Sequence, residues 1–173
     1  NAAKFAGMPV GPLSLNDEVA VDLSQKIMKA SIADLGEASV KPEHMALVDK
    51  LVNDLDRRGR KNAKGFYVYP EGGKKVIWPG LVEHFVKPEK VAISEAEFEE
   101  LKERLLFRQS IESARCFEEG VLTSVADANI GSIFGIGMAP WTGGVLQYIN
   151  YIGLPQFVKR ADELAAKHGD RFT

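Results

Sequence analysis

The chain has 173 residues, 45% of them hydrophobic and 27% charged, so it can bury a core as one soluble domain or two small ones. Its 22 Lys and Arg residues nearly balance 24 Asp and Glu residues, and the net charge of -2 argues against nucleic acid or an anionic membrane as the main partner. The single cysteine, Cys116, excludes a disulfide within the chain, and we expect it to lie buried on a helix. No apolar run of about 20 residues and no signal-like start occurs, which favours the cytoplasm.

The first half of the chain predicts two helices and a basic loop. Apolar residues four apart predict a helix over residues 13–35, which Gly36 ends; its stripe is Leu15, Val19, Leu23 and Ile27. Pro42 fits the first turn of a second helix, whose apolar face is Met45, Val48, Leu51, Val52 and Leu55. Residues 57–65 are basic and contain glycine, which indicates a loop. A short extended piece at residues 66–69 and a turn-rich connector at 70–79 follow.

The second half predicts further helices. Ser94 and Glu97 have the spacing of a capping box that begins a third helix. Its apolar stripe then changes phase, from Phe98, Leu101 and Leu105 to Phe107, Ile111, Ala114, Phe117 and Val121. This pattern fits either one long helix with two different partners or a break near Leu106, and Gly120 ends or bends the helix. Short helices are expected at residues 126–136 and 143–152, and a last one begins near Pro155 with an inward face of Phe157, Ala161, Leu164 and Ala165. Strand signal is nearly absent, so the predicted class is all-α.

One segment of the sequence recurs. Residues 7–13 and residues 137–145 each contain a Gly-Met turn, a proline and then a glycine that enters an amphipathic helix. A repeat with so long an interval indicates a duplicated domain rather than a solenoid unit. Helices precede the turn in the second copy but not in the first, and the chain begins at Asn1 without Met. We therefore expect the first copy to be incomplete at its start, in a truncated protein.

Several blocks carry a family resemblance. They are residues 7–22, 59–69, 112–120, 127–137 and 140–144. The first two resemble the C-terminal domain of 3-hydroxyacyl-CoA dehydrogenases, and the others resemble the second such domain of the multifunctional fatty-acid oxidation proteins. The resemblance implies tandem duplicated helical domains like the C-terminal domain of 6-phosphogluconate dehydrogenase. The first, incomplete copy with its linker would cover residues 3–92, and the second copy residues 93–173.

The resemblance also implies an activity for the parent protein. Members of this family oxidise L-3-hydroxyacyl-CoA to 3-ketoacyl-CoA with NAD in β-oxidation, often on a polypeptide that also carries an enoyl-CoA hydratase, and some work beside a thiolase subunit. NAD lies on an upstream Rossmann domain, where a His paired with a Glu removes the hydroxyl proton. Here Gly131, Gly135 and Gly137 do not form a Gly-x-Gly-x-x-Gly turn after a strand. We therefore expect no catalytic residue in this chain and no activity from it alone.

The candidate binding residues come from the resemblance. Lys61 matches the family's basic residue that reaches bound NAD from the helical side, and a flexible ammonium suits an anionic dinucleotide. The alternative is that the cations of residues 57–64 form only a solvated charge run. Phe134 lies where relatives place a tyrosine against acyl-CoA, although an aromatic in a core between the repeats fits equally. Pro9 and Val10 are candidates for a wall of the acyl channel, or for a packed turn.

Other polar residues imitate functional groups. His84 lies in a segment, residues 83–88, that imitates the family's block around the catalytic histidine, but it follows the Gly-Phe-Tyr segment instead of preceding the helical region, so a linker histidine is the preferred interpretation. His44 and His168 are expected at exposed helix positions, and no Cys or His spacing predicts a metal site. Helix-surface positions are expected for four acidic residues: Asp17, Asp22, Glu118 and Glu119.

The apolar pattern predicts a scaffold role. Residues 93–173 are expected to pack partly against the first copy through a face made of Phe107, Ile111, Ala114 and Phe117. An incomplete first copy would leave apolar surface exposed, which favours self-association. The alternative function is a helical interaction module diverged from the dehydrogenase. A third hypothesis, RNA binding by the cations of residues 57–64, lacks stacking aromatics.

Overall fold

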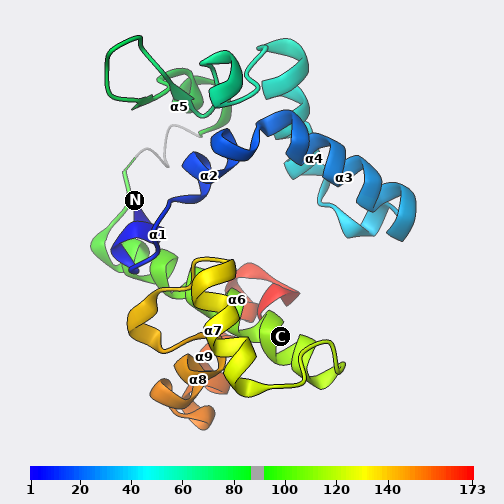
Figure 1. The fold of residues 1–173 in the computed structure, drawn as a ribbon, viewed down its shortest axis with the longest axis vertical. Helices are drawn as coiled ribbons and strands as arrows, with labels where there is room; N and C mark the ends of the chain where they lie inside the picture. The colour runs from blue at the N-terminus through cyan, green and yellow to red at the C-terminus, as the bar shows by residue number, and fades with distance from the viewer. Residues whose placement is uncertain (87–91) are drawn as a thin grey trace. The chain divides into compact units, whose positions relative to one another are not determined.

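The computed structural model describes residues 1–86 and 92–173, and it confirms the all-α class (Figure 1). Within these residues the only sheet is a two-stranded antiparallel pair, β1 (Tyr67–Val68) and β2 (Val76–Ile77). The chain forms two compact units. One contains Pro12–Ala92, and the other contains Asn1–Gly11 together with Ile93–Thr173.

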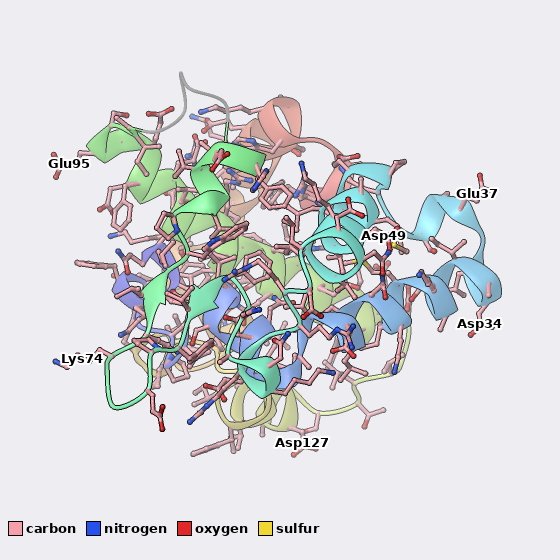
Figure 2. All side chains as sticks on the ribbon, turned by 90° about the horizontal axis from the view of Figure 1, so that it is seen from above. Asp34, Glu37, Asp49, Lys74, Glu95 and Asp127 are labelled. Atoms are coloured by element: carbon pink, nitrogen blue, oxygen red, sulfur yellow. The ribbon has the colours of Figure 1, made fainter. Side chains whose placement is uncertain are left out.

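The Pro12–Ala92 unit is built on three helices, α2 (Pro12–Val19), α3 (Val21–Leu35) and α4 (Pro42–Asp49). A π-helical turn continues α4 over Lys50–Asp54, and α5 (Gly80–Phe85) follows the small sheet. Helices α3 and α4 lie side by side, and Gln25 Nε2 donates a hydrogen bond of 2.6 Å to Asp49 Oδ1 between them. Figure 2 shows Asp34 and Glu37 pointing outward where α3 ends and in the turn beyond it, so this end of the helix pair is solvated.

The single helix expected over residues 13–35 is wrong, because α2 and α3 are separated at Ala20. Ala20 has φ 80°, a backbone conformation that breaks the helix and that a non-glycine residue rarely adopts. The break brings the Val21 amide to the Arg58 carbonyl oxygen at 3.1 Å and buries the Val21 side chain completely. The core of the unit therefore forms around residues outside the predicted stripe: Val21, Val48, Leu51, Val52 and Phe66. The predicted stripe itself is exposed on α2 and α3.

The second unit is organised around α6 (Glu95–Glu118), the longest helix (Figure 1). Around it lie α1 (Ala2–Phe5), α7 (Val125–Gly135), α8 (Val145–Ile152) and α9 (Leu154–His168). The capping box is confirmed, since the Ser94 side chain accepts from the Glu97 amide and the Glu97 carboxylate accepts from the Ser94 amide. Helix α6 runs without a break through Leu106. The consecutive residues Leu106 and Phe107 are both buried, so the apolar face shifts around the helix at this point.

The core of this unit centres on Phe107. Its ring stacks on Phe157 at 4.3 Å between centroids and meets the edge of Tyr148 at 6.0 Å. The predicted inward face of α9 is confirmed by the burial of Phe157, Ala161 and Leu164. On α6, Phe107 and Ile111 are buried within the unit, whereas the Phe117 side chain is exposed. That this face packs against the first repeat stays a prediction.

The first eleven residues pack into the second unit. Ala3 and Ala6 are buried, and Trp141 Nε1 donates a 2.7 Å hydrogen bond to the Ala6 carbonyl oxygen. Gly7, at φ 97°, lies under the same indole, where a Cβ atom would come within 2.8 Å of Trp141 Cδ1. The contacts thus group residues 1–11 with residues 93–173, whereas the family resemblance implied one domain over residues 3–92. That the two regions are copies of one domain stays a prediction.

An ion-pair network joins α6 to the end of α9. The Glu100 carboxylate accepts from Lys167 Nζ at 2.9 Å and contacts His168 Nε2 at 2.8 Å, with Arg160 Nη2 3.6 Å away. His168 is therefore half-buried in this network, and the exposed position expected for it is wrong. Hydrogen bonds from Lys167 and then His168 lower the pKa of Glu100 to about 2, although burial acts in the opposite direction.

This lowered pKa predicts a loss of stability in acid. Because the pKa of the Glu100 carboxyl is about 2 in the folded unit and 4.5 for an ordinary glutamate, the Glu100 contribution should be fully present above about pH 4.5 and disappear as the pH falls toward 2. Glu100→Gln should cost about 1 kcal/mol at pH 7, a modest value because the network is partly solvated, and almost nothing near pH 2. Urea unfolding at several pH values measures this, with Glu99→Gln on the exposed side of α6 as the control. A Glu100→Gln cost that does not change with pH would contradict it.

No helix among residues 1–86 and 92–173 is long and apolar enough to span a membrane.

Candidate functional site

The predicted basic loop is a closed turn between α4 and β1. Its base is tied by two backbone hydrogen bonds, from the Gly59 amide to the Lys64 carbonyl oxygen at 2.7 Å and from the Lys64 amide to the Gly59 carbonyl oxygen at 3.1 Å. A single 3₁₀ turn, Arg60–Asn62, forms its tip, and Ala63 at φ 59° turns the chain back. The Lys61 side chain is therefore presented from a short, defined turn rather than from an irregular segment.

Asp17 of α2 anchors the segment that follows this loop, residues 66–69. Its carboxylate accepts hydrogen bonds from the Phe66 amide at 2.7 Å, from the Tyr67 amide at 2.9 Å and from the Tyr69 hydroxyl at 2.9 Å. The residue is completely buried. The helix-surface position expected for Asp17 is therefore wrong, because the carboxylate is satisfied by a segment that begins 49 residues later in the chain.

Two glycines allow the loop to approach α2 so closely. A Cβ atom at Gly65 would overlap the Asp17 carboxylate, and one at Gly59 would lie 2.6 Å from the Asp17 carbonyl oxygen. Gly59 also has φ 103°, which favours glycine. The spacing of these glycines, which the sequence marks only as a loop signal, is required by contact with Asp17.

Arg57 holds the same backbone from the opposite side. Its Nε donates to the Gly65 carbonyl oxygen at 2.7 Å, and Nη2 donates to the Tyr67 carbonyl oxygen at 3.1 Å. The guanidinium lies 3.9 Å from the centroid of the Trp78 ring and is only 6% exposed. Burial lowers the pKa of Arg57, and the nearby Asp17 charge opposes that shift. Residues 65–67 are thus held through their N–H groups by an anion and through their carbonyl groups by a cation.

Lys61, the predicted NAD contact, is paired with Asp22 at the start of α3. The Lys61 ammonium lies 2.6 Å from Asp22 Oδ2, and the lysine side chain is 48% exposed. This hydrogen bond is the main reason why the pKa of Asp22 is lowered. Asp22 is therefore an ion-pair partner rather than a freely solvated surface charge. In the same way Arg60 Nη1 binds Glu18 at 2.8 Å, so an anionic ligand at this loop would compete with two carboxylates.

The other predicted binding residues belong to the second unit. Phe134 of α7 is 86% exposed, the highest value among the large apolar side chains that the structure describes. It is therefore not a core residue of its unit. Pro9 and Val10 are also exposed, and the Pro9 ring lies beside Gly137, within 3.3 Å of where a Cβ atom would be. Their assignment to the substrate stays a prediction.

The remaining candidates have structural environments. His84 stacks on Trp78, with ring centroids 5.5 Å apart, while Lys87 and Pro88 of the same segment lie outside the described residues. His44 is exposed on α4, as expected, and Cys116 is half-buried on α6. In the part of the chain that the structure describes, no three His, Cys, Asp or Glu residues are grouped so that they could hold a metal ion.

A cavity of about 280 Å³ in the second unit has no counterpart in the sequence pattern. Its lining combines three aromatic rings with two acids and a lysine: Phe5, Trp141, Tyr148, Glu99, Glu103 and Lys102. Glu99 pairs with Lys102 and Glu103 with Arg160, so these charges are already compensated. Burial raises the pKa of Tyr148 to about 12, which keeps its hydroxyl protonated at neutral pH.

The region that contains the basic loop matches a known protein family. Residues 1–69 match the model of the family described as 3-hydroxyacyl-CoA dehydrogenase, C-terminal domain. The chain is 37% identical over 166 residues to the fatty acid oxidation complex subunit alpha of Vibrio parahaemolyticus, and 39% identical over 172 residues to that of Shewanella sp. strain MR-7. It is 40% identical over 166 residues to that of Shewanella amazonensis.

These alignments cover 96% of this chain but only 22% to 23% of each relative, so the chain spans less than a quarter of the length of the proteins it matches. The matched family domain contains Asp17, Gly59, Lys61, Gly65 and Tyr69 together. The first 69 residues are therefore similar to the C-terminal domain of the 3-hydroxyacyl-CoA dehydrogenases, and the chain as a whole is similar to the alpha subunits of fatty acid oxidation complexes.

Proposed function

We propose that the chain is the helical C-terminal region of an NAD-dependent L-3-hydroxyacyl-CoA dehydrogenase of β-oxidation, within a longer polypeptide. The observation that carries the proposal is the basic loop of the matched domain, which holds Lys61 on a turn fixed by Asp17 and Arg57. In the parent enzyme, NAD would supply the hydride acceptor for oxidation of the 3-hydroxyl group. This chain would supply a scaffold and one contact to the dinucleotide.

The residues of this chain fit NAD only in part. The Lys61 ammonium is half-exposed and suits a phosphate of the dinucleotide, but the described residues contain no parallel strands on which a dinucleotide could be bound. NAD would therefore be bound by an upstream Rossmann domain. The catalytic histidine and glutamate would also lie there, and the isolated chain should not oxidise 3-hydroxybutyryl-CoA.

The acyl-CoA contacts are proposed for the second unit. Phe134 exposes nearly its whole ring and offers an apolar surface to the acyl or pantetheine part, and Pro9 and Val10 would line the acyl channel. The cytoplasm is the proposed location. A thiolase subunit is the proposed partner, because the relatives are named as subunits of a fatty acid oxidation complex.

Replacing Lys61 tests the NAD contact. In the longer polypeptide, Lys61→Ala should raise the KM for NAD about tenfold, because a charged contact is lost, while kcat and the KM for 3-hydroxybutyryl-CoA change little. Steady-state rates at varied NAD measure this. Lys74→Ala is the matched control, since Lys74 projects outward from the 70–75 turn (Figure 2). If Lys61→Ala leaves the KM for NAD unchanged, Lys61 does not contact NAD and is only one of the solvated cations of residues 57–64.

A second candidate function is a helical interaction module diverged from the dehydrogenase. It is favoured by the apolar stripe of α2 and α3, where Leu15, Val19, Leu23 and Ile27 are 45% to 57% exposed. The same surface would support self-association of the chain. If the longer polypeptide has dehydrogenase activity and Lys61→Ala raises its KM for NAD as expected, the dehydrogenase is favoured over the interaction module.

A further inference from the structure

The Asp17 carboxylate accepts hydrogen bonds from three donors. Two are backbone amides, of Phe66 and Tyr67, and the third is the Tyr69 hydroxyl, which shares Oδ2 with the Tyr67 amide. The amides hold the chain at one point, whereas Tyr69 holds it two residues further along. The Tyr69 amide in turn donates to the Ala63 carbonyl oxygen at 3.3 Å, inside the basic loop. Tyr69 therefore connects the buried carboxylate to the turn that carries Lys61.

The same helical segment also receives the cations of the loop. Glu18 follows Asp17 directly and binds Arg60, and Asp22 stands just after the break between α2 and α3 and binds Lys61. Asp17 thus fixes the base of the loop, while its two acidic neighbours along the chain align the tip. A loop released from Asp17 would lose the register that brings Lys61 to Asp22.

We propose that Tyr69 and Asp17 act as positioning residues, a latch that sets the position of the Lys61 turn and so the affinity of the parent enzyme for NAD. This inference rests on the proposed contact between Lys61 and NAD. Burial and the hydrogen bond to Asp17 raise the pKa of Tyr69, so the hydroxyl remains a donor throughout the range in which the enzyme would work. The latch touches neither the hydride nor the substrate, and it acts through the turn alone.

The chain offers a close control for Tyr69. Tyr67 lies two residues earlier on the same segment, and its hydroxyl makes no hydrogen bond to any described residue. Tyr69→Phe removes one bond to Asp17 and leaves both amides in place, so it is far milder than a change of Asp17 itself. Tyr67→Phe removes a hydroxyl from the same segment without touching the latch.

The test is a double-mutant cycle in the longer polypeptide. Tyr69→Phe should raise the KM for NAD about three- to tenfold, the value of one buried hydrogen bond, with kcat and the KM for 3-hydroxybutyryl-CoA within about twofold. Tyr67→Phe should leave all three unchanged. Because the latch acts through Lys61, adding Tyr69→Phe to Lys61→Ala should raise the KM for NAD no further.

This design distinguishes a failure of the proposed NAD contact from a failure of the proposed latch. If Lys61→Ala raises the KM for NAD but Tyr69→Phe does not, or if the two effects multiply, the latch is wrong and the NAD contact stands. If Lys61→Ala has no effect, the NAD contact is wrong and the latch has nothing to position. A loss of kcat in Tyr69→Phe with an unchanged KM for NAD would also overturn the latch.

Discussion

Asp17→Ala should destabilise the Pro12–Ala92 unit by about 3–5 kcal/mol, the range for removing one partner of a buried charged group. The substitution leaves the Phe66 and Tyr67 amides and the Tyr69 hydroxyl without their acceptor. It also leaves the buried Arg57 guanidinium without the nearby negative charge. The chain has two tryptophans, and only Trp78 lies in this unit, so a Trp141→Phe background makes Trp78 fluorescence in urea a report on this unit alone.

The control for Asp17 is its neighbour Glu18. Glu18→Ala removes a carboxylate of the same helix that pairs with Arg60, but both side chains are exposed. Its cost should stay below about 1 kcal/mol, as is usual for surface ion pairs. Equal costs for Asp17→Ala and Glu18→Ala would mean that the Asp17 carboxylate is not buried in the folded chain.

Phe107→Ala should have the second large effect, about 3–5 kcal/mol in the unit built on α6, because it opens a cavity between Phe157 and Tyr148. Here a Trp78→Phe background leaves Trp141 as the reporter of urea unfolding. Phe134→Ala is the matched control, since it removes the same side chain from an exposed position of the same unit and should change stability by about 0.5 kcal/mol or less. A small effect of Phe107→Ala would contradict its place in the core.

Local signals predicted the helices of the second unit well. The capping box at Ser94 and Glu97 is formed within four residues, and Pro155 stands in the first turn of α9 as expected. The inward face of α9 repeats every three to four residues within one helix. These features depend on neighbours along the chain, so the sequence alone contains the information that determines them.

The break at Ala20 could not be predicted in this way. Leu15, Val19, Leu23 and Ile27 continue their four-residue spacing across it, and nothing local marks Ala20 as a residue with positive φ. The reason for the break is distant, since it brings the Val21 amide to the Arg58 carbonyl oxygen. The expected stripe is exposed because the core is built instead from the face that Val21 occupies.

Of the candidate site, only the tip of the basic loop, which carries Lys61, was predicted from the sequence. Lys61 was identified because the basic, glycine-containing loop resembles that of the family, whereas its ion pair with Asp22 joins residues far apart along the chain. Asp17 was missed because a carboxylate on a predicted helix is normally solvated. The available signal was Gly65 followed by aromatic residues, which indicates close contact with another segment but not its identity.

The central claim is that buried Asp17 fixes the Lys61 loop by accepting the Phe66 and Tyr67 amides. Amide hydrogen exchange of the 173-residue chain tests it directly. Both amides should be among the slowest to exchange in the Pro12–Ala92 unit, while the Gly72 amide in the exposed turn exchanges quickly. If the Phe66 and Tyr67 amides exchange as fast as that of Gly72, the carboxylate does not hold the loop.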